Sequence, residues 1–132
     1  MKKTALILLM LSLADAEDLK LQIYKPLTGS CPASWMTEME MTIAKPEIVS
    51  LTDVKSLKHS IGIPRELYSC NTSVLGDYVF EGNVPPAVIK KFMAEKPEGA
   101  IGLSLPASQN EEAVKKVYII YADGTYKIYE TF

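Results

Sequence analysis

The sequence predicts an α/β fold in which helices flank one mixed sheet. Strand-like segments alternate along the chain with helical segments that begin or end at prolines. Asp123-Gly124, between two apolar runs, is a strong hairpin signal. Strand–helix–strand order requires parallel crossovers, whereas hairpins are antiparallel. The sheet should therefore contain strands of both kinds.

The first half of the chain predicts two strands, each followed by a helix. Leu19–Tyr24 alternates apolar and polar residues, as a half-buried strand does. Pro32 suits the first turn of a helix that runs to about Ala44, where Lys45-Pro46 ends it. Glu47–Leu51 forms a short second strand. Asp53 can cap the next helix, which passes His59 and ends at Gly62.

The second half predicts four strands around one helix. After an irregular segment from Arg65 to Thr72, Ser73–Phe80 is a strand pair or a bulged strand interrupted by Gly76-Asp77. Pro85-Pro86 opens a helix to about Lys96. Val117–Tyr121 and Tyr126–Tyr129 then form the hairpin. The resulting order, β-α-β-α-β-β-α-β-β, indicates a thioredoxin-like α/β sandwich.

The first sixteen residues have the features of a cleavable export signal. Lys2 and Lys3 precede an apolar run from Thr4 to Leu13, and Ala14-Asp15-Ala16 fits the signal peptidase rule. The apolar run is too short to span a membrane, and nothing later could cross one. We therefore expect a signal peptide at 1–16, a single domain at 17–132, and a periplasmic or otherwise exported protein.

Composition argues against several classes of function. The formal net charge is −2, and no basic patch could track a phosphate backbone, so nucleic acid is not an expected partner. There is no phosphate-cradling glycine loop or nucleophile elbow, which makes an enzyme the less favoured class. His59 is the only histidine, and its place in the last turn of a helix beside Lys58 favours a surface role.

Two motifs stand close together in the middle of the chain: Gly62–Val74, containing Ser-Cys-Asn-Thr, and Gly76–Pro85, containing Tyr-Val-Phe-Glu-Gly-Asn-Val-Pro. They resemble motifs of the periplasmic CopG-type copper-resistance family, whose members are thioredoxin-like metal-binding proteins. Family members carry Ser-Cys-His-Thr, then Tyr-x-x-Glu-Gly-His-Val-Pro, and a Cys-x-Cys-Cys run shortly before a Trp. The resemblance extends from the first strand to Pro106. It implies a soluble envelope protein whose partners are copper or another envelope copper protein.

The sequence departs from the family pattern where the metal ligands should be. Counting back from Trp35, the Cys-x-Cys-Cys run falls on Gly29–Pro32, which has only one cysteine. Asn71 and Asn83 replace the two histidines, and Leu103–Ser108 replaces a segment rich in Met and Gly. The family is thought to bind a thiolate-ligated Cu(I) cluster, which needs several thiolates. We therefore expect at most a reduced Cu(I) site.

Cys31 and Cys70 are the central candidate residues. Cys31 lies at the start of a helix, where the helix dipole favours thiolate, but Ser34 stands where a redox motif would have its second cysteine. The resemblance makes Cys70 the natural partner of Cys31. Three alternatives stay open: a structural disulfide contributing about 3–4 kcal/mol, a two-coordinate Cu(I) site, and a pair of free or redox-active thiols.

Methionines that follow Cys31 could add thioether ligands to a Cu(I) site. Met36, Met39 and Ile43 have the spacing of a buried helix face bordered by Trp35, so core packing is the favoured interpretation for Met36 and Met39. Met41 lies off this stripe. The predicted metal residues are therefore Cys31 and Cys70, with Met36 or Met39 as an additional ligand.

Overall fold

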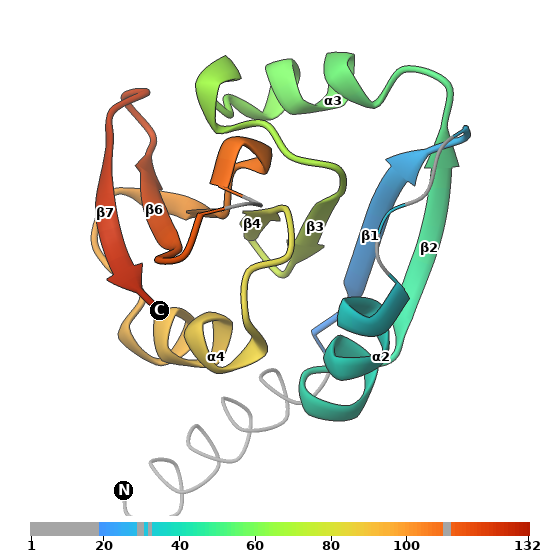
Figure 1. The fold of residues 1–132 in the computed structure, drawn as a ribbon, viewed down its shortest axis with the longest axis horizontal. Helices are drawn as coiled ribbons and strands as arrows, with labels where there is room; N and C mark the ends of the chain where they lie inside the picture. The colour runs from blue at the N-terminus through green and yellow to red at the C-terminus, as the bar shows by residue number, and fades with distance from the viewer. Residues whose placement is uncertain (1–18, 29–30, 32, 110–111) are drawn as a thin grey trace, which may run out of the picture.

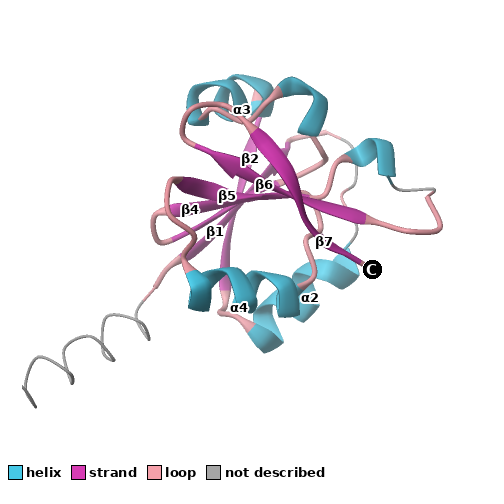
Figure 2. Ribbon diagram, turned by 90° about the vertical axis from the view of Figure 1, so that its left-hand side faces the viewer, coloured by secondary structure: helices cyan, strands magenta, loops and turns pink. Residues whose placement is uncertain are grey.

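The computed structural model describes residues 19–28, 31, 33–109 and 112–132, which form one seven-stranded sheet with helices on both faces. The strand order is β2-β1-β3-β4-β5-β6-β7. Helix α3 covers one face, and α2 and α4 cover the other (Figure 2). The strands are β1 Leu21–Pro26, β2 Pro46–Leu51, β3 Thr72–Leu75, β4 Tyr78–Glu81, β5 Ala100–Ser104, β6 Lys116–Tyr121 and β7 Tyr126–Thr131. The helices are α2 Ala33–Thr42, α3 Val54–Ile61 and α4 Pro86–Glu95, with the 3₁₀ turns η1 Arg65–Leu67 and η2 Ala107–Gln109.

The sheet is mixed, as predicted. β1 pairs with β2, and β4 with β5, in parallel, while the other four neighbouring pairs are antiparallel. Each parallel pair is joined by a crossover helix, α2 or α4, and both helices pack on the same face (Figure 1). The predicted thioredoxin-like α/β sandwich is confirmed.

Most of the hydrophobic core lies between the sheet and helices α2 and α4. Alternation in β1 directs Leu21 and Ile23 into it, with exposed fractions of 2% and 0%. Phe92 of α4 is its aromatic centre, with an edge-to-face contact to Phe80 at a centroid distance of 5.7 Å. A smaller cluster lies on the opposite face and contains Ile63, Leu67, Val79 and Ile120.

The predicted start and end of α3 are confirmed in atomic detail. The Asp53 carboxylate accepts a hydrogen bond from the Ser56 backbone N–H at 3.1 Å, which satisfies one free donor of the first turn. Gly62 ends the helix with φ +99°, a conformation that residues with a Cβ rarely adopt.

Strand β5 was not predicted, because its sequence, Ala-Ile-Gly-Leu-Ser, has few residues that favour strands. The structure explains this composition at Gly102. A Cβ there would lie 1.7 Å from the Val79 carbonyl oxygen of the neighbouring strand, so the close approach of β4 and β5 requires glycine.

None of the helices in the described residues is long and apolar enough to cross a membrane. The predicted signal peptide lies outside the described part of the chain.

Candidate functional site

The two cysteines meet where the end of β1 lies beside the start of β3, which follows from the register of these strands. β1 and β3 are antiparallel, with Tyr24 opposite Thr72, so the chain leaving β1 and the chain entering β3 lie at the same end of the two strands. Cys31 follows β1 and Cys70 precedes β3. They form a disulfide, with a Cα–Cα distance of 5.9 Å and a sequence separation of 39. Of the three alternatives left open by the sequence, the structure contains the disulfide.

The two asparagines that replace the histidines of the CopG-type motifs also lie at this end of the strands. β4 pairs with β3 so that Glu81 lies opposite Thr72, which brings Asn83, just after β4, beside Asn71. The Asn71 Nδ2 donates a hydrogen bond to Asn83 Oδ1 at 3.0 Å. Asn71 is fully buried, and its Oδ1 accepts no hydrogen bond from the described residues. A neutral amide pair thus occupies the position next to Cys70.

A buried ion pair holds the segment that contains Cys70. Lys58 of α3 and Glu81 of β4 are 2% and 0% exposed and form a direct ion pair. The Lys58 Nζ also donates to Thr72 Oγ1 at 2.8 Å, and Thr72 Oγ1 donates to Glu81 Oε1 at 2.6 Å. The Ser69 backbone N–H donates to Glu81 Oε2 at 2.7 Å. Glu81 therefore binds the residues on both sides of Cys70-Asn71.

Burial dominates the electrostatics of this pair. Removal from water raises the pKa of Glu81 and lowers the pKa of Lys58, because both charged forms lose hydration. In each case the charge of the partner opposes the effect of burial. The charge of each member therefore favours the charged form of the other.

The buried ion pair was missed from the sequence, which indicated Lys58 only as a cation in the last turn of α3. The signal that could have found it is spacing. Lys58 follows the buried Val54 by four residues, and positions four apart share one helix face. Lys58 thus projects from the face that packs on the sheet.

The structure explains why position 82, in the Glu-Gly-Asn-Val-Pro motif, is glycine. Its φ is +78°, and a Cβ would lie 2.5 Å from the Leu105 carbonyl oxygen and 2.7 Å from Ser69 Oγ. The Gly82 N–H donates to the Asn71 carbonyl at 2.8 Å. Glycine therefore lets the end of β4 contact both the Cys70 segment and the chain that follows β5.

The methionines contribute to packing. Met39 is fully buried in the core, and Met36 is half-buried and packs against the same cluster, which agrees with the favoured interpretation. Met41 is 82% exposed. His59 is exposed on α3, as expected. In the described residues, no three His, Cys, Asp or Glu side chains form a group that could hold a metal ion.

Comparison with known proteins identifies the fold. Residues 67–109, which contain Cys70, both asparagines and Glu81, match a family model described as "Protein of unknown function, DUF411". Two solved structures, "Copper resistance protein copG- Form 2" and "Copper resistance protein copG- Form 1", each superpose with a TM-score of 0.74 at 20% identity. They cover 86% of this chain, which spans 98% and 97% of theirs. The chain has the CopG fold.

The fold thus confirms the predicted resemblance to CopG-type proteins over 86% of the chain. The family model separately matches residues 67–109, which contain most of the two motifs. No curated protein sequence matches the chain. Within the CopG fold, the ends of β1 and β4 and the start of β3 bring together Cys31, Cys70, Asn71 and Asn83, while Met39 lies in the core.

Proposed function

We propose that this chain is an exported copper-handling protein that binds one Cu(I) through the thiolates of Cys31 and Cys70 once their disulfide has been reduced. One observation carries the proposal: within the CopG fold, the two cysteines meet beside the two positions where the family has histidine. The proposed role is sequestration or transfer, in which the bound ion is cargo.

Oxidation state decides whether the site suits copper. Cu(I) prefers thiolate and thioether ligands, and a disulfide offers no thiolate. A dithiol reductant supplies the two electrons and two protons that convert this disulfide into two thiols, and is itself oxidised to a disulfide. Binding of Cu(I) then releases the thiol protons. Both cysteines are half-buried, so a reductant and a metal donor can reach them from solvent. The disulfide therefore acts as a gate for copper binding.

The surrounding side chains limit the affinity. The amides of Asn71 and Asn83 are poor ligands for a soft metal. Met36 is the better thioether candidate, because it is half-buried near the start of α2, whereas Met39 would have to leave the core. We expect two thiolate ligands from Cys31 and Cys70, with Met36 as the candidate third ligand.

Anaerobic titration of the reduced protein with Cu(I) against a chelator tests the proposal. The expected result is one Cu(I) per chain in the reduced protein, none in the oxidised protein, and none in Cys31→Ser or Cys70→Ser. Met36→Leu should weaken binding, whereas Met41→Leu, at an exposed position, should not. Absence of competitive binding by the fully reduced protein would refute the copper proposal.

Restoring the histidines provides a gain-of-function test. Asn71 and Asn83 are in contact, so Asn71→His with Asn83→His would place two imidazoles next to Cys70. Imidazole is a better copper ligand than an amide, so this double variant should retain Cu(I) against a stronger competitor than the parent protein does. Asn71→Gln with Asn83→Gln is the matched control, because glutamine is larger than asparagine but remains an amide. Equal retention by both variants would contradict the ligand assignment.

A second candidate function is a metal-free interaction module, which the disulfide and the Asn71–Asn83 hydrogen bond favour. In that case Cys31→Ser lowers the melting temperature and there is no copper binding to lose. A third use of the same pair, thiol redox chemistry, predicts a reduction potential well above the roughly −300 mV limit typical of structural disulfides. Equilibration with glutathione and thioredoxin buffers measures that potential.

A further inference from the structure

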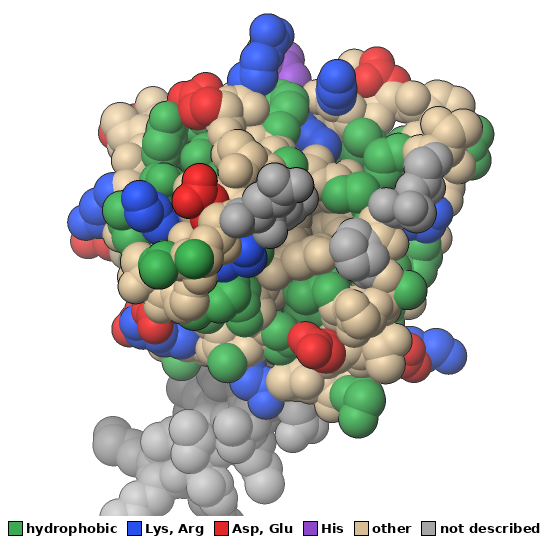
Figure 3. Space-filling model, viewed as in Figure 1, with side chains coloured by type: hydrophobic (Ala, Val, Ile, Leu, Met, Phe, Trp, Pro, Cys, Tyr) green, Lys and Arg blue, Asp and Glu red, His purple; other side chains and the backbone are tan. Residues whose placement is uncertain are grey.

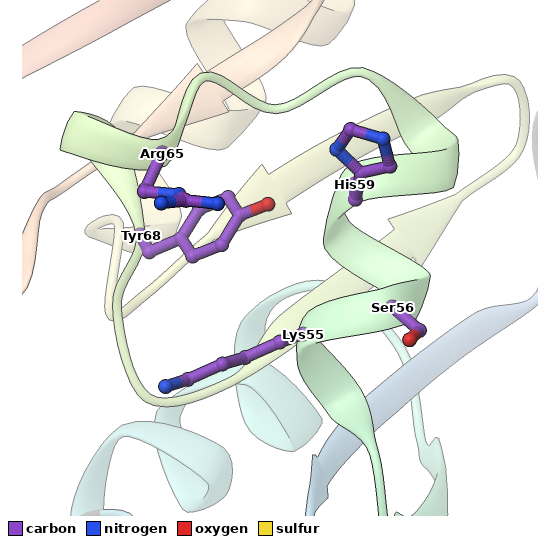
Figure 4. A pocket seen from close by; sticks show the side chains of 5 residues that line it. All are labelled: Lys55, Ser56, His59, Arg65 and Tyr68. Carbon is purple, nitrogen blue, oxygen red and sulfur yellow. The ribbon is translucent and has the colours of Figure 1, made fainter.

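A cleft between α3 and the segment Arg65–Tyr68 carries positive charge. Its volume is about 540 Å³, and it is lined by Lys55, Ser56, His59, Arg65 and Tyr68. Figure 4 shows Lys55, Ser56 and His59 on α3, and Arg65 and Tyr68 on the segment across from this helix. In Figure 3, Lys and Arg side chains lie next to the single histidine at the top of the molecule. The cleft lies on the face of the sheet opposite α2 and α4.

The cations of this cleft are not neutralised by other described residues. The described residues contain two ion pairs, Lys58–Glu81 and Lys91–Glu130, so neither Lys55 nor Arg65 has an ion-pair partner there. Among the described residues, no carboxylate lines the cleft. The wall therefore presents two positive charges in a chain whose formal net charge is −2.

The two acidic residues nearest to this wall in sequence are bound to other groups. Asp53 accepts hydrogen bonds from the Ser56 N–H at 3.1 Å and from the Ser56 Oγ at 2.6 Å. Its pKa is lowered chiefly by these bonds, and only to a lesser extent by the charge of Lys55. Glu66 accepts a hydrogen bond from the Tyr126 hydroxyl at 2.8 Å. Lys55 and Arg65 thus keep their donors for a ligand.

Tyr68 provides a polar and an apolar contact in the same cleft. Its hydroxyl forms no hydrogen bond with the described residues, so it can donate one. Its ring, together with the methylene stems of Lys55 and Arg65, provides apolar surface beside the charges. The Lys58 ammonium lies 5.8 Å from the ring centroid, but Glu81 already neutralises it.

We propose that this cleft binds a small organic phosphate monoester, with Lys55 and Arg65 on the phosphate and the Tyr68 ring against the organic group. A phosphate monoester carries nearly two negative charges at neutral pH, which matches the two cations. The guanidinium fork and the ammonium are the side-chain groups that bind phosphate best. The volume lies within the range of small-molecule sites and far exceeds that of a bare ion. This site does not depend on the copper proposal.

Phenyl phosphate is the probe, and backbone amide shifts of the oxidised protein in NMR are the readout. Saturable shifts confined to α3 and residues 65–69 are expected, with inorganic phosphate binding more weakly and phenol not binding. Lys55→Met and Arg65→Met should each weaken binding by about tenfold, an effect of roughly 1.4 kcal/mol. Lys45→Met removes an exposed lysine elsewhere and should leave binding unchanged.

Three results would overturn the proposal. The first is the absence of saturable shifts up to about 10 mM phenyl phosphate. A site with a Kd of about 1 mM, which corresponds to a binding free energy of about −4 kcal/mol, would be nearly saturated at that concentration. The second is equal binding by the parent, Lys55→Met and Arg65→Met proteins. Benzoate is the test of ligand class: binding as tight as that of phenyl phosphate would refute the phosphate assignment, and clearly weaker binding would support it.

Discussion

Replacing Lys58 by methionine tests the role of the buried ion pair in holding the Cys70 segment. The substitution leaves the Glu81 carboxylate fully buried without its counter-charge, although Ser69 and Thr72 still donate to it. Removing one partner of a buried pair destabilises proteins by about 3–5 kcal/mol. For a domain of this size we expect a fall in melting temperature of roughly 10–20 °C. Thermal unfolding followed by circular dichroism measures it.

The pH dependence distinguishes loss of charge from loss of packing. Burial raises the pKa of Glu81 above its ordinary value of 4.5, and removal of Lys58 raises that pKa further. When the pKa of a carboxyl group is higher in the folded state than in the unfolded state, its protonation stabilises the fold. This stabilisation is complete below the unfolded-state pKa and is lost as the pH rises through the folded-state pKa. The destabilisation by Lys58→Met should therefore be smaller at about pH 5 than at about pH 8.

Two further variants complete the test. Lys55→Met, an exposed lysine one turn earlier in α3, should change the free energy of unfolding by less than about 0.5 kcal/mol. Glu81→Gln added to Lys58→Met should recover part of the loss, because a neutral amide can still accept from Ser69 and donate to Thr72. A destabilisation by Lys58→Met that is independent of pH and not relieved by Glu81→Gln would refute this reasoning.

Three further predictions concern stability. Reduction of the Cys31–Cys70 disulfide should lower the free energy of unfolding by about 3–4 kcal/mol, measured by urea unfolding with and without reductant, because it closes a long loop. Gly102→Ala should prevent normal folding or destabilise by more than about 3 kcal/mol, measured by expression and melting, because its Cβ would overlap the Val79 carbonyl. Trp35→Phe should cost about 1–3 kcal/mol in urea, since it removes a 2.7 Å hydrogen bond to a buried carbonyl.

Matched comparisons make these predictions falsifiable. The Cys31→Ser/Cys70→Ser protein should unfold like the reduced parent, and a large difference between them would show that the disulfide acts otherwise. Gly124→Ala, with φ +87° and nothing near its added Cβ, should cost only about 1–2 kcal/mol. Similar losses at Gly102 and Gly124 would contradict the steric explanation. A Trp35→Phe protein as stable as the parent would show that water replaces the lost donor.

Local signals predicted most elements of the fold. Asp53 and Gly62 bound α3 because capping and left-handed conformation depend on neighbouring residues alone. Pro86 begins α4 for the same kind of reason. Strand β5 escaped prediction because Gly102 is selected by the distance to another strand, which no local pattern expresses.

The sequence by itself determined the fold class, the resemblance to CopG-type proteins, and the list of side chains available to a soft metal. Only the tertiary structure decided which of them meet. The pairing of β1, β3 and β4 brings Cys31 to Cys70 and Asn71 to Asn83. The packing of α3 on the sheet buries Lys58 against Glu81, and the same helix forms one wall of the basic cleft. These juxtapositions depend on strand register and on free energies of burial, which are properties of contacts between residues far apart in the chain.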